Sequence, residues 1–536
     1  MLQSSGERIA AIWGIVAIAI TAIVVNPLQP VMTMVAKRAL SMPAVACETG
    51  GGGVNVATTD NLQTLINANP DGTVFCLQAG THRPATNAGY TPKAGNVFQG
   101  VGANAIVSGG KTITGFTTSG SNYVADGFLP SAPTDNRGNC RAEYPLCEQS
   151  HDVYLNGVWL EKVGSQGALA AGKVYLDYPN NKIYIRDNPS GQTVEQAWAT
   201  KLFSGSVTNV QIKNLTIQMT AGNAQTGAIG ITGTGWIINN NEIKWNHGTG
   251  LLTTVGYTAT GNKVHHNGQS GVGGNGIVVF DRNEVSHNNT AGYNDLWEAG
   301  NKFGNYEGTQ HKLTATNNYF HDDFGPGIWC DINCGETLIA NNYVAHEWGQ
   351  GIFYEISCGP AIIRDNTVVG NYVAGISSSA SKNVEVYNNK VYTDPDYVHP
   401  LKGTTIPDQR GIWHYQQDRP EFSTVCGTHD QTNINTHDNQ VELNGPDSAY
   451  GGKNGLWTDT KRTDIYSSKG NSFSNNTYYD TDSSTGWEFQ WNICGDWPCS
   501  VNFDGWQSAG QDTTGSTSNS NPTPPAAPTL VVGPQA

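Results

Sequence analysis

The sequence predicts an all-β protein, a parallel β-helix solenoid with an inserted antiparallel β module, and three observations support this prediction. Residues after a recurring Gly alternate between apolar and polar, which is the period of a half-buried strand. Successive copies of the repeat are mostly 21 to 24 residues apart, enough for three short strands per coil. Periods of roughly 20 to 50 residues are typical of stacked repeats. An Asn, any residue and a large apolar residue precede each Gly, at Asn241/Gly250, Asn262/Gly271, Asn283/Gly292, Asn318/Gly327, Asn342/Gly351 and Asn366/Gly375.

Each repeat Asn is expected at a bend between two strands. Asn tolerates a left-handed backbone, and its side chain can hydrogen-bond to the same Asn of the next coil. A leucine-rich repeat fits less well because there is no Leu ladder. A propeller fits less well because its blades need about 40 residues or more.

The organisation along the chain follows from where the repeat is present and where it is lost. Residues 9–25 form an uncharged apolar run, short for a membrane span and long for a signal core. We therefore expect an export signal or transmembrane anchor, and a body that is secreted or held at the cell surface. The expected parts are 1–50 for the export segment and a Gly-rich joint, 51–118 for a cap and the first coils, 119–200 for the inserted module, 201–445 for the main β-helix with its cleft, 446–507 for a C-terminal coil or cap, and 508–536 for a disordered tail.

Composition narrows the class of partner. The net charge of −15 argues against nucleic acid or an anionic membrane surface as a partner. Charged residues make up only 14% of a chain rich in Gly, Tyr and Trp, which suits a surface that binds polysaccharide or oligosaccharide. We expect a monomer.

Ten cysteines indicate an oxidising compartment and disulfide bonds. Cys334 and Cys358 have equal phase in adjacent coils, so their Cα atoms are expected about 5 Å apart, within disulfide range. Cys140/Cys147 and Cys494/Cys499 are candidate local pairs. Since no CxxC pair or Cys/His cluster has zinc spacing, the sequence predicts no metal site.

Two acidic residues, Asp331 and Glu355, lie four residues after the repeat Gly in consecutive coils. Stacked strands are about 4.8 Å apart, so the two carboxylates are expected side by side. Like charges at this distance raise the pKa of one partner, as a general acid requires. Retaining glycosidases place two carboxyl groups about 5 to 5.5 Å apart. A solvated acidic face or a calcium site is the alternative explanation.

Other candidate substrate-binding residues surround this pair. Trp329 and Phe353 precede the two acids by two residues. In the later coil around Gly411, Trp413 corresponds to these aromatic residues and Tyr415 to the acids. The interval from Asn283 to Asn318 is 35 residues, and its extra loop brings Glu298 and Lys302, which could equally serve the loop's own structure. Further candidates lie at turns, where they could simply be polar surface residues: His321, Asp323 and His346.

Residues from about 200 to 445 are similar to the right-handed β-helix proteins of the pectate-lyase-like superfamily. The pair Gly-Ile-Trp-Cys-Asp331 and Gly-Ile-Phe-Tyr-Glu355, with a β module inserted after the first coils, resembles β-helix glycoside hydrolases of a retaining β-xylosidase type. The resemblance implies Asp331 as nucleophile and Glu355 as acid/base.

Three functions remain open at this point. The first is an exported retaining glycoside hydrolase without a cofactor. The second is a polysaccharide lyase or epimerase, in which the acids would hold Ca²⁺ and a Lys, Arg or His would abstract a proton; near Asp331 only Lys302 could do so. The third is a non-catalytic glycan binder or adhesin.

Overall fold

The computed structural model describes residue 47 and residues 52–133, 138–294, 298–304, 310–419, 422–443, 453–459, 462–480, 488–494, 497–520 and 522–534. The apolar run 9–25, expected to be an export signal or membrane anchor, lies outside these residues. Among the residues described, no helix is long and apolar enough to span a bilayer.

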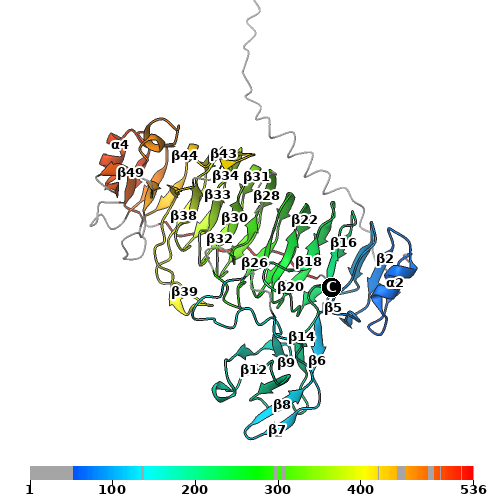
Figure 1. The fold of residues 1–536 in the computed structure, drawn as a ribbon. Coiled ribbons are helices and arrows are strands. Elements are labelled where there is room, and N and C mark those ends of the chain that lie inside the picture. Colours follow the sequence, from blue (N-terminus) through cyan, green and yellow to red (C-terminus); the bar gives the residue numbers. More distant parts are fainter. Residues whose placement is uncertain are drawn as a thin grey trace, which may run out of the picture. The chain divides into compact units, whose positions relative to one another are not determined.

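Most of the described residues from 52 onward form a β-helix whose coils contribute strands to three long parallel sheets, which we name A, B and C (Figure 1). The chain passes from sheet C to sheet A to sheet B and then into sheet C of the next coil, as in β30, β31, β32 and β33. The fold class predicted from the sequence is therefore confirmed.

Sheet A contains, in order, β1 (Val54–Val56), β2 (Val74–Leu77), β4 (Val97–Gly100), β16 (Gln211–Lys213), β19 (Ile237–Asn239), β22 (Gly256–Thr260), β25 (Ile277–Asp281), β28 (His311–Thr316), β31 (Cys334–Ala340), β34 (Ala361–Arg364), β37 (Lys382–Tyr387), β44 (Thr432–His437) and β47 (Ser472–Ser474). Sheet B contains β3 (Gly80–His82), β5 (Ala105–Ser108), β17 (Thr216–Gln218), β20 (Glu242–Lys244), β23 (Lys263–His265), β26 (Glu284–Ser286), β29 (Tyr319–His321), β32 (Tyr343–Ala345), β35 (Thr367–Val369), β38 (Lys390–Tyr392), β45 (Gln440–Glu442), β48 (Thr477–Tyr479) and β51 (Ser516–Ser518).

Sheet C, which carries the acid pair, contains β15 (Phe203–Gly205), β18 (Gly227–Ile231), β21 (Thr249–Thr253), β24 (Val272–Gly274), β27 (Lys302–Phe303), β30 (Ile328–Asp331), β33 (Ile352–Glu355), β36 (Ile376–Ser379), β41 (Trp413–Gln416), β46 (Asn454–Thr458), β49 (Phe489–Cys494) and β50 (Trp497–Val501). The last two strands pair antiparallel, whereas the preceding pairs are parallel.

Side chains that alternate along these strands fill one continuous core. Ile238, Phe280 and Ile339 of sheet A and Ile328 and Ile352 of sheet C are fully buried in it. The helix expected near the start of the solenoid is α2 (Leu62–Ala68), capped by Asn61 and packed through Leu62 and Ile66 against this core. Burial of these apolar faces is the main source of stability of a stacked repeat.

Strands β6 to β14 form two small sheets outside the solenoid, antiparallel except for the pair β11/β12, with a core of their own that includes Val153, Val174 and Ile183. They are β6 (Gly110–Thr112), β7 (Thr117–Ser119), β8 (Asn122–Asp126), β9 (Val153–Leu155), β10 (Val158–Trp159), β11 (Glu161–Lys162), β12 (Lys173–Asp177), β13 (Lys182–Ile185) and β14 (Val194–Ala197). Figure 1 shows this module projecting from the side of the solenoid. The remaining short elements are the 3₁₀ turn Gln166–Ala168, α3 (Asp464–Ser467), α4 (Phe503–Ser508), and the hairpins β39 (Val398–His399)/β40 (Thr404–Thr405) and β42 (Phe422–Ser423)/β43 (Gly427–Thr428).

The repeat Asn residues form the expected ladder. The Oδ1 atom of Asn262 accepts from the backbone N–H and the side-chain amide of Asn241, at 3.0 and 3.1 Å, and the same two bonds recur coil after coil. The left-handed residue is the one before each Asn, such as Asn240 and Asn317, rather than the repeat Asn itself. The ladder pairs buried backbone donors that would otherwise be unsatisfied.

Four disulfides join described cysteines, and they fit an oxidising environment. Cys47 pairs with Cys76, and Cys140 pairs with Cys147 as predicted. The side chains of Cys494 and Cys499 lie outside the part of the chain that the structure describes.

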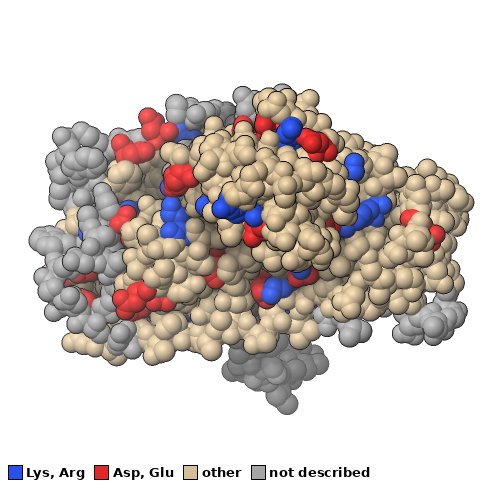
Figure 2. All heavy atoms as spheres, turned by 90° about the horizontal axis from the view of Figure 1, so that it is seen from below, with Lys and Arg blue, Asp and Glu red and all other residues tan. Residues whose placement is uncertain are grey.

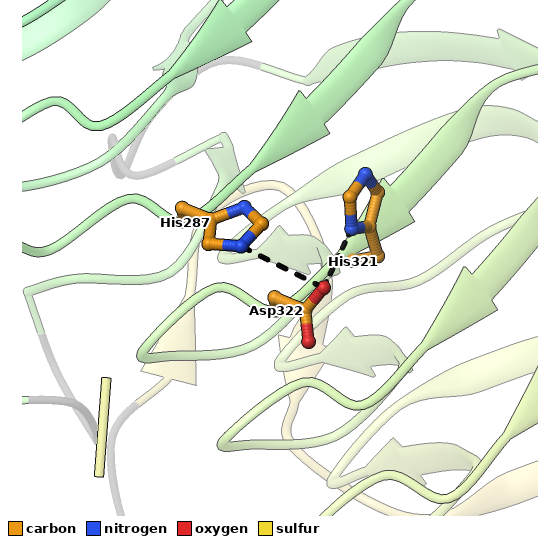
Figure 3. Close-up of side chains that lie close together, drawn as sticks. All are labelled: His287, His321 and Asp322. Atoms are coloured by element: carbon orange, nitrogen blue, oxygen red, sulfur yellow. Dashed lines mark hydrogen bonds and ion pairs between the residues drawn. The ribbon is translucent and has the colours of Figure 1, made fainter. Parts of the chain in front are cut away.

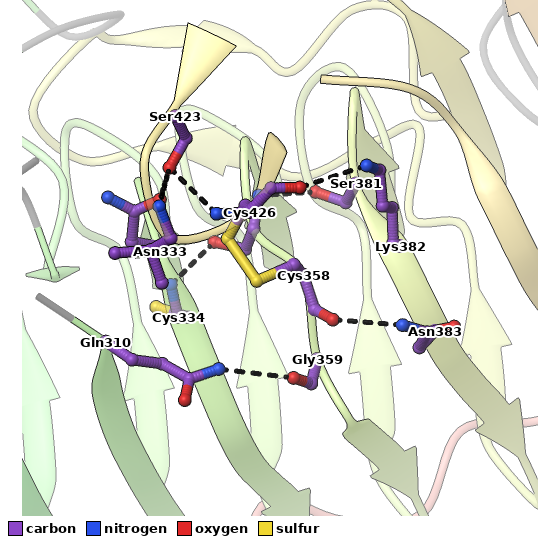
Figure 4. The surroundings of a disulfide bond; sticks show 12 residues. Gln310, Asn333, Cys334, Cys358, Gly359, Ser381, Lys382, Asn383, Ser423 and Cys426 are labelled. Carbon is purple, nitrogen blue, oxygen red and sulfur yellow. Dashed lines mark hydrogen bonds between the residues drawn. A yellow bond between two sulfur atoms is a disulfide. The ribbon is translucent and has the colours of Figure 1, made fainter. Parts of the chain in front are cut away.

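The predicted Cys334–Cys358 bond is wrong. Cys334 pairs with Cys330, and Cys358 pairs with Cys426 (Figure 4). The two residues are indeed neighbours, since Cys358 N–H donates to Cys334 C=O at 3.2 Å. Equal phase did not give the two side chains the same direction. Cys334 is buried in the core, whereas Cys358 is partly exposed and bonds to Cys426 beside the β42/β43 hairpin.

The tail expected to be disordered contributes to the fold. β51 pairs with β48 at the end of sheet B. Farther along, Tyr343 Oη donates to Pro525 C=O at 2.9 Å, and Gly533 N–H donates to Gly261 C=O at 2.9 Å. Backbone hydrogen bonds to a stacked sheet order a segment whose composition alone indicates disorder.

Charged residues are scattered over the visible surface. In the face seen in Figure 2, Lys and Arg side chains lie in small groups beside Asp and Glu rather than in one broad patch.

Candidate active site

Asp331 and Glu355 are direct partners in sheet C. β30 and β33 pair in parallel, with Trp329 opposite Phe353 and Asp331 opposite Glu355. Both acidic residues are only 4% exposed. Two carboxyl groups in neighbouring buried positions are costly unless each is compensated, so their surroundings decide their protonation.

Asp331 has a cation on one oxygen and no partner on the other. Lys302 Nζ lies 3.0 Å from Asp331 Oδ2 and 3.8 Å from the centre of the Trp329 ring. Asp331 Oδ1 is buried and accepts no hydrogen bond from a described residue. A buried oxygen to which no described residue donates is unusual enough to require an explanation.

Both oxygens of Glu355 accept hydrogen bonds. Trp329 Nε1 donates to Glu355 Oε2 at 3.1 Å, and Gln417 Nε2 donates to Glu355 Oε1 at 2.6 Å. Arg419 Nη2 lies 3.5 Å from the same Oε1. Burial and the neighbouring charge of Asp331 nevertheless raise the pKa of Glu355 to about 7, against the opposing effects of Gln417, Arg419 and Lys302.

Lys302 occupies a position that the sequence left undefined. In β27 it is the register partner of Trp329, and therefore lies in the same outward column as Trp329 and Phe353. The insertion in the preceding coil obscured this register, since β27 consists of only two residues, Lys302 and Phe303.

The predicted aromatic neighbours are stacked along sheet C. The rings of Trp329 and Phe353 lie 5.7 Å apart at 25°, and those of Trp413 and Tyr415 lie 5.2 Å apart at 21°. Tyr415 is opposite Ser379, which is opposite Glu355, so it belongs to the acid column as expected. Burial and the charge of Glu355 raise the pKa of the Tyr415 hydroxyl.

Gln417 and Arg419 were not identified from the sequence. They continue the alternation of Trp413 and Tyr415 beyond β41, and that period is the signal that could have found them. Arg419 Nε donates to Gln417 Oε1 at 2.6 Å, which fixes the Gln417 amide toward Glu355. The Cys358–Cys426 disulfide holds the following hairpin, β42 and β43, against the solenoid.

A cavity of about 260 Å³ adjoins Lys302 on sheet C. Thr254 and Asn275 line it, from the same column as the acid pair in earlier coils, and so does Glu298. Glu298 is held in place by Asn139, whose backbone N–H and side-chain amide donate to it at 2.7 and 2.6 Å. A larger cavity of about 560 Å³ lies beside the inserted module and is lined by Trp159, Trp245 and other residues distinct from the acid pair.

His321, Asp323 and His346 lie on or next to sheet B rather than sheet C. Asp323 is fully buried in a second ladder, where Asn288 and Asn301 donate to its two oxygens, and burial raises the pKa of Asp323 to about 6. His346 stacks on Tyr397 at 3.5 Å between ring centres. His321 contacts Asp322 and Glu284. The strands of sheets B and C point in different directions, so these turn residues do not reach the acid pair and contact the partners named above instead.

A family model for the right-handed β-helix region matches residues 227–391. No curated protein matches the chain. Among solved structures, the complex of XylC with xylose is similar to it, with 12% identity, 80% of this chain and 83% of that chain covered, and a TM-score of 0.53.

Two further solved structures are similar to this chain. They are the A-module of mannuronan C-5 epimerase AlgE6 from Azotobacter vinelandii and the catalytic unit of the GH87 α-1,3-glucanase from Streptomyces thermodiastaticus. The first has 13% identity, covers 88% of this chain and 100% of that chain, and has a TM-score of 0.49. The second has 10% identity, covers 89% and 69%, and has a TM-score of 0.42. At these identities the likeness concerns the fold, and these neighbours are carbohydrate-active enzymes.

Proposed function

We propose that the protein is an exported glycoside hydrolase that retains anomeric configuration, with Asp331 as nucleophile and Glu355 as acid/base. The observation that carries the proposal is the unequal environment of two adjacent carboxyl groups. Asp331 is paired with Lys302 and has one oxygen to which no described residue donates, while the pKa of Glu355 is raised to about 7 by burial and by Asp331. Paired acids with divergent environments are typical of an acid and a nucleophile.

In the first step, Asp331 Oδ1 attacks the anomeric carbon while protonated Glu355 gives its proton to the leaving oxygen. The glycosidic bond breaks and a covalent glycosyl ester forms on Asp331. In the second step, ionised Glu355 takes a proton from water, which attacks the same carbon and releases Asp331. Hydrogen bonds from Trp329 and Gln417 stabilise the ionised Glu355 that this step needs.

The first experiment is a panel of aryl glycosides and plant and bacterial glycans, with xylosides included because XylC was solved with xylose. New reducing ends without ultraviolet absorbance support hydrolysis. Glu355→Gln is expected to lower the rate by about 10² to 10⁴ on sugars with poor leaving groups, and less on aryl glycosides whose leaving group needs no proton.

Asp331→Ala tests the nucleophile. Added azide can attack the anomeric carbon of an activated aryl glycoside from the vacated side, so we expect rescue with an inverted glycosyl azide. The matched control is Glu336→Gln on β31, where a carboxylate 38% exposed pairs with Lys312. Loss of activity in the control, or full activity in Asp331→Ala, would contradict the assignment.

A polysaccharide lyase or epimerase is the second candidate, and Lys302 and Arg419 favour it. Their side chains are 18% and 23% exposed, against 6% for the side chain of each acid, so an anionic sugar meets them before it reaches the acids. In that reaction a base removes a proton next to a carboxylate and no glycosyl ester forms. Unsaturated products from uronic-acid polymers, lost on adding a chelator, would refute the hydrolase.

A further inference from the structure

A second cluster of side chains lies at the end of sheet B, whereas the acid pair lies on sheet C. His287 follows β26, and His321 and Asp322 close β29. Ser286 is the register partner of His321, so the next residues, His287 and Asp322, are stacked in consecutive coils. Their ligand-type atoms all lie within 4.8 Å of one another.

The two histidines converge on a single carboxylate oxygen (Figure 3). His321 Nδ1 lies 2.7 Å from Asp322 Oδ2, and His287 Nε2 lies 3.9 Å from the same atom. Ligands about 2.0 to 2.2 Å from a tetrahedral metal ion are roughly 3.3 Å apart. The observed separations lie on either side of that value, so small side-chain rotations would accommodate an ion.

A hydrogen bond orients Asp322, and a second carboxylate lies behind His321 beyond hydrogen-bond distance. Tyr397 Oη donates to Asp322 Oδ1 at 2.5 Å, which leaves Oδ2 toward the histidines. Glu284 Oε1 lies 3.7 Å from His321 Nε2, on the far side of the ring from Asp322. A carboxylate behind a histidine is the arrangement that orients imidazole ligands in metal sites.

The backbone is left-handed at this turn. His287 and Asp322 have φ of 56° and 59°, and the equivalent residues of the neighbouring coils, His266 and His346, have φ of 54° and 58°. His and Asp are among the residues enriched in this region, so the side chains rather than the backbone distinguish this cluster.

A comparable pair elsewhere lacks the third group. His437 Nδ1 lies 2.6 Å from Asp438 Oδ2, and His437 Nε2 lies 3.3 Å from Glu385. The ring stacked on His437 is Tyr387, at 5.1 Å, in place of a second histidine. At the first cluster, His287 stacks on His266 with ring centres 5.0 Å apart, and its Nε2 is also directed at the oxygen that His321 contacts.

We propose that His287, His321 and Asp322 form a binding site for a divalent transition-metal ion, with Zn²⁺ as its probe. Two imidazoles and one carboxylate suit Zn²⁺ and its neighbours rather than Ca²⁺. Three protein ligands leave one position for water, and the ion would join two consecutive coils next to Tyr397. This site was not predicted from the sequence, because His287 precedes His321 by 34 residues and Asp322 by 35, across the irregular interval.

The test uses untagged, chelator-treated protein titrated with ZnCl₂ by calorimetry, and with Co²⁺ followed by visible absorption. One equivalent of Zn²⁺ is expected to bind, and Co²⁺ is expected to give the absorption bands of a low-coordinate site. His287→Asn and Asp322→Asn should each weaken binding by about 100-fold or more, and Glu284→Gln by about 10- to 100-fold. Asn is chosen because it tolerates the left-handed backbone.

Asp438→Asn is the matched control and should leave Zn²⁺ binding unchanged. Thermal unfolding of the chelator-treated variants establishes that they are folded. The absence of a one-equivalent site in the wild-type protein, or equal Zn²⁺ affinity in the wild type and Asp322→Asn, would overturn the proposal.

Discussion

The unequal acid pair predicts that removing the charge of Glu355 stabilises the protein at neutral and alkaline pH. The folded-state pKa of Glu355 is raised from 4.5 to about 7. Each pKa unit corresponds to about 1.4 kcal/mol, so ionising Glu355 costs the folded state about 3 kcal/mol. The folded state avoids this cost below pH 4.5, where Glu355 is protonated in both the folded and the unfolded chain. The corresponding stability is lost as the pH rises through about 7.

Glu355→Gln mimics the protonated acid at every pH, because its amide has the same shape and no charge. The variant should match the wild type near pH 4 and exceed its unfolding free energy by about 3 kcal/mol at pH 8. Urea unfolding at intervals from pH 4 to 8 measures this difference, and titrating groups that do not interact with Glu355 cancel between the two proteins. A variant less stable than wild type at pH 8, or a constant difference across this range, would refute the reasoning.

Asp331→Asn is expected to lower the free energy of unfolding, whereas Glu355→Gln raises it. It lowers the pKa of Glu355 by removing a like charge, but it leaves Lys302 without its carboxylate. Breaking a buried ion pair costs about 3 to 5 kcal/mol, and less here because the Lys302 side chain is 18% exposed. Glu336→Gln, at an exposed ion pair, should change stability by only about 0 to 1 kcal/mol at any pH in this range.

Three further predictions concern the surroundings of the site and the end of the chain. Trp329→Phe keeps the stacking on Phe353 but removes the hydrogen bond to Glu355, worth about 1.5 kcal/mol or more to the ionised form. The pKa of Glu355 should rise further, and the alkaline limb of a pH–rate profile should move up by about one pH unit; an unmoved limb would contradict this. Peptide mapping without reduction should recover a Cys358–Cys426 link, and a Cys334–Cys358 peptide would count against the fold described. A chain ending at residue 515 lacks β51 and should unfold at a lower temperature than one ending at residue 521; equal transitions would speak against the docking of β51.

The repeat in the sequence was sufficient to predict the solenoid and the register of its regular coils. Residues of equal phase must stack when every coil has nearly the same length, so the adjacency of Asp331 and Glu355 followed directly from two Gly positions. The Asn ladder followed for the same reason. Local chemistry also placed the Cys140–Cys147 bond, since its partners are seven residues apart.

Side-chain direction and irregular segments depended on the tertiary structure. Cys334 and Cys358 are adjacent through the backbone, yet their side chains point to different partners, and phase alone carries no information on that. The short β27 put Lys302 in the aromatic column because the strands on either side fix its register, although its own interval breaks the repeat. The same interval separates His287 from Asp322 in sequence while the stack brings them together.

The sequence by itself determined which residues share a column of the β-helix, because a constant coil length converts sequence phase into spatial position. Only the tertiary structure decided what each member of a column contacts. The difference between Asp331 and Glu355 is the clearest case. The two acids have the same phase in the repeat, and their contacts with Lys302, Trp329 and Gln417 make their environments unequal. Those partners come from separate coils, and their effect on a buried charge depends on distances of a few ångströms that no spacing in the sequence specifies.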